Sequence, residues 1–306
     1  MLWLLLAIAA HFLFALVALG DKYLLSKSLP EPLTYAFFVG LLGALLFLAT
    51  PFLGLPLPAA HALVLAVAGG TAFTLGNWRY FCGLKLFEAS RIVPATGGLV
   101  PLITLLLGLA FLPHAAPLTL THWIALALLI IGTITISLDP SKKISGRSFG
   151  MAALAALLFA SSFSLMKLAY LEQPFWSGLF WSQVGMTGTA LIFLLLSPAL
   201  RRDLLGSRQE FSTRLKPQTL ALFLGIQAGG ASGSLLQSAA IFFAPALYVA
   251  FVNAMQGFQY MILLLLTVIL SRRHSQIIQE TSSPGTFIQK SVAILMILLG
   301  TGLLLL

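Results

Sequence analysis

Side chains suited to binding a small molecule lie inside apolar stretches of this sequence. Asn77, Arg79 and Tyr80 follow a nearly uninterrupted apolar run that begins near Ala62. An arginine near the bilayer centre costs roughly 2.5–3.5 kcal/mol on insertion scales. The Arg79 head group could reach the lipid surface, or it could hold an anionic group such as a carboxylate. Helical periodicity turns Arg79 about 160–200° away from Asn77, so both face one cavity only if the helix end is irregular.

Further polar side chains lie in two later apolar stretches. Asn253, Gln256 and Tyr260 share one helical stripe, and Gln237 lies in the stretch before them. An unsatisfied amide facing lipid costs several kcal/mol, so these side chains must face other helices or water. They are therefore either hydrogen-bonding contacts between helices or the lining of a cavity. In the second case, rings such as Trp181 and Tyr260 would form its walls.

Ionisable groups inside the apolar stretches are few. His11 lies near the centre of the first stretch and is either a buried, neutral, hydrogen-bonded histidine or a proton-coupling group, because imidazole titrates in the physiological range. Lys27 and Lys167 lie at the ends of their apolar stretches and are interpreted as anchors at the lipid surface. All eight acidic residues fall at stretch ends or in loops, which favours a neutral, zwitterionic or anionic ligand.

Sequence patterns for catalysis, metal binding and nucleotide binding are missing. The five histidines show no HExxH spacing, and no GxxxxGK[ST] loop occurs. We therefore expect no enzyme, no catalytic residue, no metal and no cofactor. An intramembrane enzyme is the alternative from another class. A channel-like protein is a third, although no pore-lining charge ring or filter segment stands out.

These polar residues are set in a chain that is 59% hydrophobic and only 8% charged. A soluble domain carries about 25% charged residues, so the composition predicts an integral membrane protein. The apolar residues form long continuous blocks, which indicates helices rather than a β-barrel. The net charge of +9 comes from basic residues between the blocks. We therefore expect contact with membrane lipid and no nucleic-acid binding.

Ten blocks are long enough to cross about 30 Å of hydrocarbon. The expected spans are 2–25, 33–52, 59–82, 89–112, 120–138, 148–170, 175–197, 217–239, 244–270 and 286–306. The first block lacks a basic leading region and a clear cleavage site, so it is interpreted as a membrane helix and not as a signal peptide. In the eighth block, Gly225, Gly229 and Gly233 predict close packing against another helix.

The blocks repeat in order after five. The aligned pairs include Gly132 with Gly300, Asn77 with Gln237, and Lys27 with Lys167. An odd number of spans per half forces the halves into opposite orientations. We therefore expect an all-α membrane protein of two inverted five-helix repeats, residues 1–138 and 148–306, with a site near the midplane between them. The candidate site residues are Asn77, Arg79, Tyr80, Gln237, Asn253, Gln256 and Tyr260, with His11 for proton coupling.

Three segments carry a recognisable pattern: YFCGLKLFEAS (80–90), Pro101 in the next block, and WIALALLIIGTITIS (123–137). This pattern resembles the ten-helix EamA-like branch of the drug/metabolite transporter superfamily. Many relatives carry a glycine-glutamate pair where this chain has FLPHAAP (111–117), and Pro101 has no counterpart in the ninth block. The resemblance implies a secondary transporter of small organic metabolites such as amino acids, an exporter or exchanger working by alternating access. The expected setting is the inner cell membrane, as a monomer or homodimer.

Basic residues are divided unequally between two sets of loops. The loops after the first, third, fifth, seventh and ninth blocks, with adjoining helix ends, hold fifteen of the 17 lysines and arginines. Short cytoplasmic loops carry the excess of these residues, so the charge places both termini outside the cell. The family resemblance implies the opposite orientation.

Overall fold

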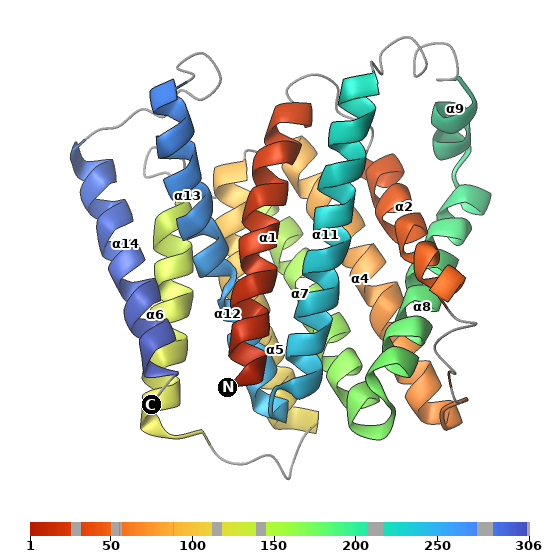
Figure 1. Cartoon of the computed structure of the whole chain (residues 1–306), viewed down its shortest axis with the longest axis horizontal. Helices are drawn as coiled ribbons and strands as arrows, with labels where there is room; N and C mark the ends of the chain where they lie inside the picture. The colour runs from red at the N-terminus through yellow and green to blue at the C-terminus, as the bar shows by residue number, and fades with distance from the viewer. Residues whose placement is uncertain are drawn as a thin grey trace.

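The computed structural model describes residues 1–25, 32–49, 55, 57–87, 89–111, 118–138, 145–206, 217–273 and 284–304. Within these residues every regular element is a helix. Figure 1 shows the helices standing side by side, with the start of α1 (Leu2–Leu25) and the end of α14 (Pro284–Leu303) at the same end of the bundle. The all-α prediction is therefore confirmed for the described residues.

Helices occupy each of the predicted stretches. After α1, the first half of the chain contains α2 (Pro32–Leu42), its continuation η1 (Gly43–Ala49), α4 (Ala60–Leu86), α5 (Ala89–Phe111) and α6 (Leu120–Ser137). Before α14, the second half contains α7 (Gly146–Glu172), α8 (Phe175–Leu196), α9 (Pro198–Gly206), α11 (Pro217–Phe243), η2 (Ala246–Tyr248), α12 (Val249–Ala254) and α13 (Gln256–Arg273). The main difference from the prediction is the ninth stretch, which is divided into η2, α12 and α13.

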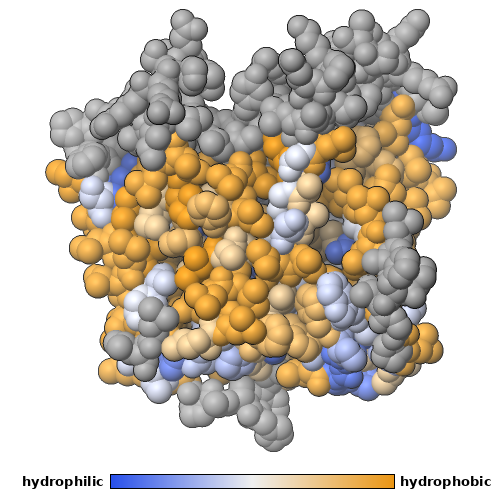
Figure 2. All heavy atoms as spheres, in the orientation of Figure 1, coloured by the Kyte–Doolittle hydropathy of each residue, from blue (hydrophilic) through white to orange (hydrophobic). Residues whose placement is uncertain are grey.

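Among the described residues, five helical segments are long and apolar enough to cross a membrane. They are Ala60–Leu86, Ile92–Phe111, Gly146–Glu172, Phe175–Leu196 and Ala246–Leu266. Shorter apolar helices cover Leu2–Ala18, Pro32–Phe47, Leu120–Ile136 and Ile288–Leu303. Figure 2 shows a broad apolar band across the visible face of the molecule, with hydrophilic residues along its lower edge and near its upper corners. A band of exposed leucines and isoleucines is the surface that lipid covers.

Glycines let α4 and α8 pack backbone against backbone. A Cβ atom added to Gly70 of α4 would overlap the carbonyl of Ser182 in α8. A Cβ atom added to Gly185 of α8 would overlap the carbonyl of Val67 in α4. Such close approach requires small residues on both helices.

The predicted glycine face of α11 packs against α1. A Cβ atom on Gly233 would lie 2.7 Å from the ring of Phe14, and one on Gly229 would lie 3.1 Å from Val17. A Cβ atom on Gly225 would meet no atom of the described residues within 4 Å. The packing prediction is therefore supported at Gly229 and Gly233.

Candidate functional site

The helical stretch after Pro245 is interrupted at Met255. The Met255 N–H donates to the Phe251 carbonyl at 3.0 Å. The Met255 carbonyl accepts from the Phe258 N–H at 2.9 Å, three residues later, and more weakly from the Gln259 N–H at 3.4 Å, so the helix tightens at this point. Every residue of α12 is buried. Irregular backbone at membrane depth is tolerated only where protein or a water-filled cavity surrounds it. The interruption therefore marks a candidate binding region, and the predicted polar residues lie on both sides of it.

Asn253 lies before the interruption and faces α5. Its Nδ2 donates to the Thr104 hydroxyl at 3.0 Å, and that hydroxyl donates to the Val100 carbonyl at 2.8 Å. The Asn253 Oδ1 is buried and has no hydrogen-bond partner among the described residues. A buried acceptor without a donor costs about 1–3 kcal/mol. This oxygen is therefore available to a donor group of a ligand.

Gln256 and Tyr260 form a hydrogen-bonded pair after the interruption. The Gln256 Nε2 donates to the Tyr260 hydroxyl at 2.6 Å. A Cβ atom added to Gly97 of α5 would lie 3.4 Å from the Gln256 Oε1 and 3.5 Å from the Tyr260 ring. Both side chains therefore face the middle of α5, as Asn253 does. The structure brings Asn253, Gln256 and Tyr260 together along one side of α5, and we call these three residues the polar stripe.

Aromatic rings from α4 and α7 lie beside this polar stripe. Tyr80 and Phe73 pack against Phe159 with ring centroids 6.2 and 5.6 Å away, and Phe163 stacks on Phe159 at 6.4 Å. Helix α7, which carries Phe159 and Phe163, packs against α5, so the ring cluster lies next to the helix that the polar stripe faces. Rings next to a few oriented polar groups are the usual lining of a small-molecule site.

Asn77 and Arg79 take different directions from α4, as helical periodicity predicts. The Asn77 Nδ2 is buried without a hydrogen-bond partner among the described residues. The Arg79 guanidinium lies 4.2 Å from the ring centroid of Trp78, and that ring packs on Phe193 of α8 at 5.4 Å. No contact in the described part of the chain joins Arg79 to the polar stripe, so Arg79 is not brought together with it.

Two further predicted residues lie on other helices. Gln237 is half-buried on α11, the helix that packs mainly against α1. Trp181 is half-buried on α8, with its ring 5.2 Å from that of Phe180. The described residues give neither side chain a direct contact with the polar stripe. Their roles stay predictions.

His11 joins α1 to both sides of the interruption. Its ring is 3% exposed, with Nε2 3.1 Å from the Val252 carbonyl and Nδ1 3.3 Å from the Gln259 Oε1. A carbonyl only accepts, so Nε2 carries a proton and donates. In the neutral ring, Nδ1 accepts a hydrogen bond from the Gln259 amide, whose nitrogen and oxygen are then exchanged. In the protonated ring, Nδ1 donates to the Gln259 Oε1. His11 is thus buried and hydrogen-bonded, and its role in proton coupling stays a prediction.

Lys167 contradicts its predicted position at the lipid surface. Its side chain is only 4% exposed. Its ammonium donates to the carbonyls of Ile241 at 3.2 Å, Phe242 at 3.0 Å and Ala244 at 2.6 Å. The last carbonyls of a helix lack partners within the helix, and a cation is favourable there. The anchor interpretation is therefore wrong, because the end of α11 offers three acceptors inside the protein. Lys27, its counterpart, lies outside the described residues.

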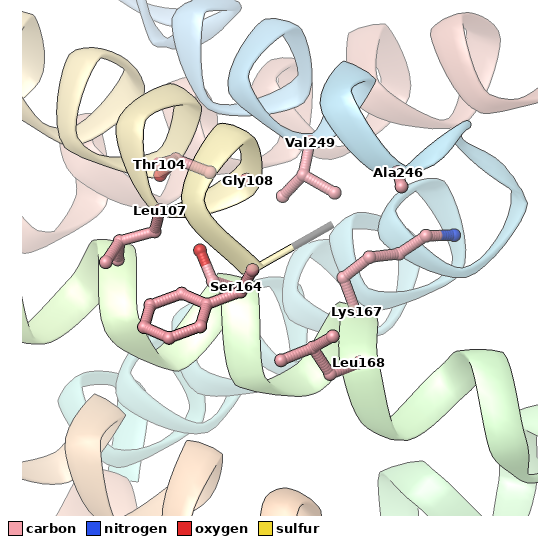
Figure 3. A pocket seen from close by; sticks show the side chains of 9 residues that line it. Thr104, Leu107, Gly108, Ser164, Lys167, Leu168, Ala246 and Val249 are labelled. Atoms are coloured by element: carbon pink, nitrogen blue, oxygen red, sulfur yellow. The ribbon is translucent and has the colours of Figure 1, made fainter. Parts of the chain in front are cut away.

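A small pocket, with room for little more than one water molecule, lies between α5, α7 and the start of α12. Figure 3 shows Thr104, Ser164 and Val249 around it, with the Lys167 ammonium extending away from the Ser164 hydroxyl. The Ser164 Oγ is buried and has no hydrogen-bond partner among the described residues. Thr104 links this pocket to Asn253, so the pocket and the polar stripe adjoin.

Sequence reasoning missed Thr104, Gly97 and Ser164. The stretch IVPATGGLV (92–100) holds small residues, a signal that α5 leaves room for facing side chains. The amides of α12 and α13 fill that room. Ser164 gave no signal, because a single serine in an apolar helix can bond its own backbone.

Comparison with known proteins supports the sequence interpretation. Residues 1–138 match the model of the EamA-like transporter family. The resemblance found in the sequence is therefore confirmed over the first half of the chain. No curated protein matches the sequence significantly.

A solved structure titled "Crystal structure of protein" shares the fold. The similarity covers 98% of this chain and 95% of that chain, with a TM-score of 0.66 and 17% sequence identity. At that identity the likeness concerns the arrangement of the helices alone.

Proposed function

We propose that this chain, whose first 138 residues match the EamA-like transporter family, is a secondary transporter of small organic metabolites such as amino acids. The family match is the observation that carries the proposal. The transporter exports or exchanges its substrate across the inner cell membrane. Ten helices cross the membrane as two inverted repeats, residues 1–138 and 148–306.

Helix packing supports the inverted repeats. When the ten predicted stretches are paired five apart, the counterparts are α1 with α7, α2 with α8, α4 with α11, α5 with α12–α13, and α6 with α14. The pairs α2–α8, α5–α12 and α6–α14 each pack together, as helices on a twofold axis do. The α4–α7 contact likewise has its counterpart in the contact between α11 and α1.

The aligned glycines Gly132 and Gly300 support the same symmetry. A Cβ atom on Gly132 of α6 would lie 3.1 Å from the Ala293 carbonyl of α14. A Cβ atom on Gly300 of α14 would lie 3.0 Å from the Ala125 carbonyl of α6. Each alanine precedes the glycine of its own helix by the same number of residues. Reciprocal contacts of this kind are expected at a twofold axis.

Two interfaces that the proposed twofold axis would exchange, α4–α8 and α11–α2, are packed unequally, and this supports alternating access. α4 packs closely against α8 at Gly70 and Gly185, whereas α11 and α2 form no close contact in the described part of the chain. A twofold operation exchanges these two interfaces. We propose that the structure is one of two states, and that the α4–α8 interface opens when the α11–α2 interface closes.

The polar stripe along α5 is the proposed substrate site. Asn253, Gln256, Tyr260 and Tyr80 hold the polar groups of the substrate, and the rings of α4 and α7 contact its apolar part. Asn77 and Gln237 join the site when the bundles move. Arg79 meets an anionic substrate at the end of its helix. Because acidic residues fall at the ends of the predicted stretches or in loops, the substrate is neutral, zwitterionic or anionic.

Transport by purified protein in liposomes tests the proposal. Radiolabelled amino acids, sugars and nucleosides are offered with and without a pH gradient, and with unlabelled compound inside. We expect accelerated exchange of at least one class and a several-fold loss with Gln256→Ala. Gly188→Ala is the control, because a Cβ atom there meets no atom of the described residues within 4 Å. Absence of exchange together with electrical conductance would favour a channel.

A further inference from the structure

The Lys167 ammonium is enclosed by backbone oxygens. Its three N–H groups match three carbonyl acceptors, those of Ile241, Phe242 and Ala244, at 2.6–3.2 Å. No acidic side chain forms an ion pair with Lys167 in the described part of the chain. A buried charge without a counter-ion is costly unless polar groups surround it. The charge of Lys167 is therefore balanced by carbonyl dipoles at the end of α11.

Carbonyls at a helix C-terminus are a known type of cation site in membrane transporters. The C-terminal end of a helix carries about half an elementary negative charge. Unwound carbonyls and helix C-termini coordinate sodium ions in several transporter folds. The end of α11 has this chemistry, and an amino group from α7 lies where the ion would be.

We propose that the end of α11 is a monovalent-cation site whose resident cation is the Lys167 ammonium. The site ties α7 to the segment that leads through Pro245 into η2 and α12. Because α12 carries Asn253, the lysine positions the proposed substrate site without touching the substrate. This consequence rests on the proposed function, whereas the cation site itself does not. Wild-type protein therefore needs no sodium or potassium at this position.

Removal of the amino group should expose the site to external cations. Full-length Lys167→Ala protein is purified in detergent, and its thermal unfolding is measured in choline, sodium, potassium and methylammonium chloride at equal ionic strength. We expect its Tm in choline to fall several degrees below that of wild-type protein. At least one small cation should restore much of this loss with a saturable dependence on concentration, and choline is too large to enter.

Two matched variants separate the cation from other causes. Lys167→Met fills the same space without charge, so its Tm should fall and respond to no cation. Lys85→Ala removes an exposed lysine of α4, so its unfolding should be the same in all four salts. Wild-type protein should likewise not distinguish the salts.

Several outcomes would overturn the proposal. Lys167→Met as stable as wild-type protein would mean that the carbonyls need no cation. Lys167→Ala that responds to none of the salts, or that folds in none of them, would mean that no refillable site exists. A saturable sodium or potassium response of wild-type protein would also contradict it. Because the readout is unfolding and not uptake, failure of the transport proposal would leave this test intact.

Discussion

Gly70 of α4 and Gly185 of α8 lie at one helix crossing, each so close to the other helix that no side chain fits between them. The Thr74 hydroxyl donates to the Met186 carbonyl at 3.5 Å across the same crossing. This contact has no close counterpart between α11 and α2 in the described part of the chain. We therefore expect the two proposed states to differ at this crossing.

Gly70→Ala should destabilise this crossing. The new methyl group would overlap the Ser182 carbonyl, and overpacking of this kind costs about 1–3 kcal/mol. We expect a lower Tm and a shift toward the state in which α4 and α8 separate, measured by the distance between spin labels on the two helices. Gly188→Ala, on the open side of α8, should change neither quantity. Equal label distances in Gly70→Ala and wild-type protein would argue against a moving interface.

Replacement of His11 by glutamine tests proton coupling. Glutamine keeps a donor for the Val252 carbonyl, 3.1 Å from the histidine Nε2, but it cannot take up a proton. Counterflow of substrate, which needs no net proton movement, should stay within about twofold of wild type. Uptake driven by a pH gradient should be lost. If strong proton-driven uptake survives in His11→Gln, His11 is not the coupling group.

Asn253 and Thr104 should be energetically coupled. A double-mutant cycle of Asn253→Ala and Thr104→Ala isolates their 3.0 Å hydrogen bond. Hydrogen bonds between membrane helices average about 0.6 kcal/mol, so we expect a coupling of that order in the free energy of unfolding. Additive effects of the two substitutions would mean that the bond contributes nothing to stability.

Gln256 should be reachable from water. Gln256→Cys, in a Cys82→Ser background, should react with a water-soluble maleimide, and substrate should slow the reaction. Ala250→Cys is the control, since position 250 is fully buried in α12 and should not react. Labelling of Gln256→Cys only after unfolding would make this amide a contact between helices. Asn253→Cys should react more slowly than Gln256→Cys, because Asn253 is only 3% exposed.

Apolar runs in the sequence predicted the described helices other than α9, which forms in a polar connection between two predicted spans. Each run ends at polar or helix-breaking residues, and the described helices begin and end within a few residues of those points. The interruption at Met255 could not be predicted in this way. No proline or glycine occupies position 255, and the break depends on surrounding helices that supply partners such as His11. Local sequence does not contain that information.

The polar stripe was easier to predict from the sequence than the position of Lys167. Asn253, Gln256 and Tyr260 share one helical face, and the cost of exposing amides to lipid directs that face inward. Lys167 looked like a residue closing its helix, yet α7 continues to Glu172. Its carbonyl partners lie more than 70 residues later in the chain. A contact at that separation depends on how α7 and α11 pack, which periodicity does not reveal.

Orientation in the membrane can be decided with one fusion. Both described termini lie at the same end of the bundle, so a single reporter places them both (Figure 1). Fifteen of the 17 basic residues belong to loops and helix ends that the predicted spans assign to the side opposite the termini, and the positive-inside rule assigns that side to the cytoplasm. The structure strengthens this count, because Lys167, the one basic residue assigned to the side of the termini, is buried in the protein and not free to interact with lipid head groups. Alkaline phosphatase fused after Leu306 should therefore be active outside the cytoplasm. A fluorescent protein at the same position, which matures only in the cytoplasm, should stay dark, and bright fluorescence there would support the orientation implied by the family resemblance.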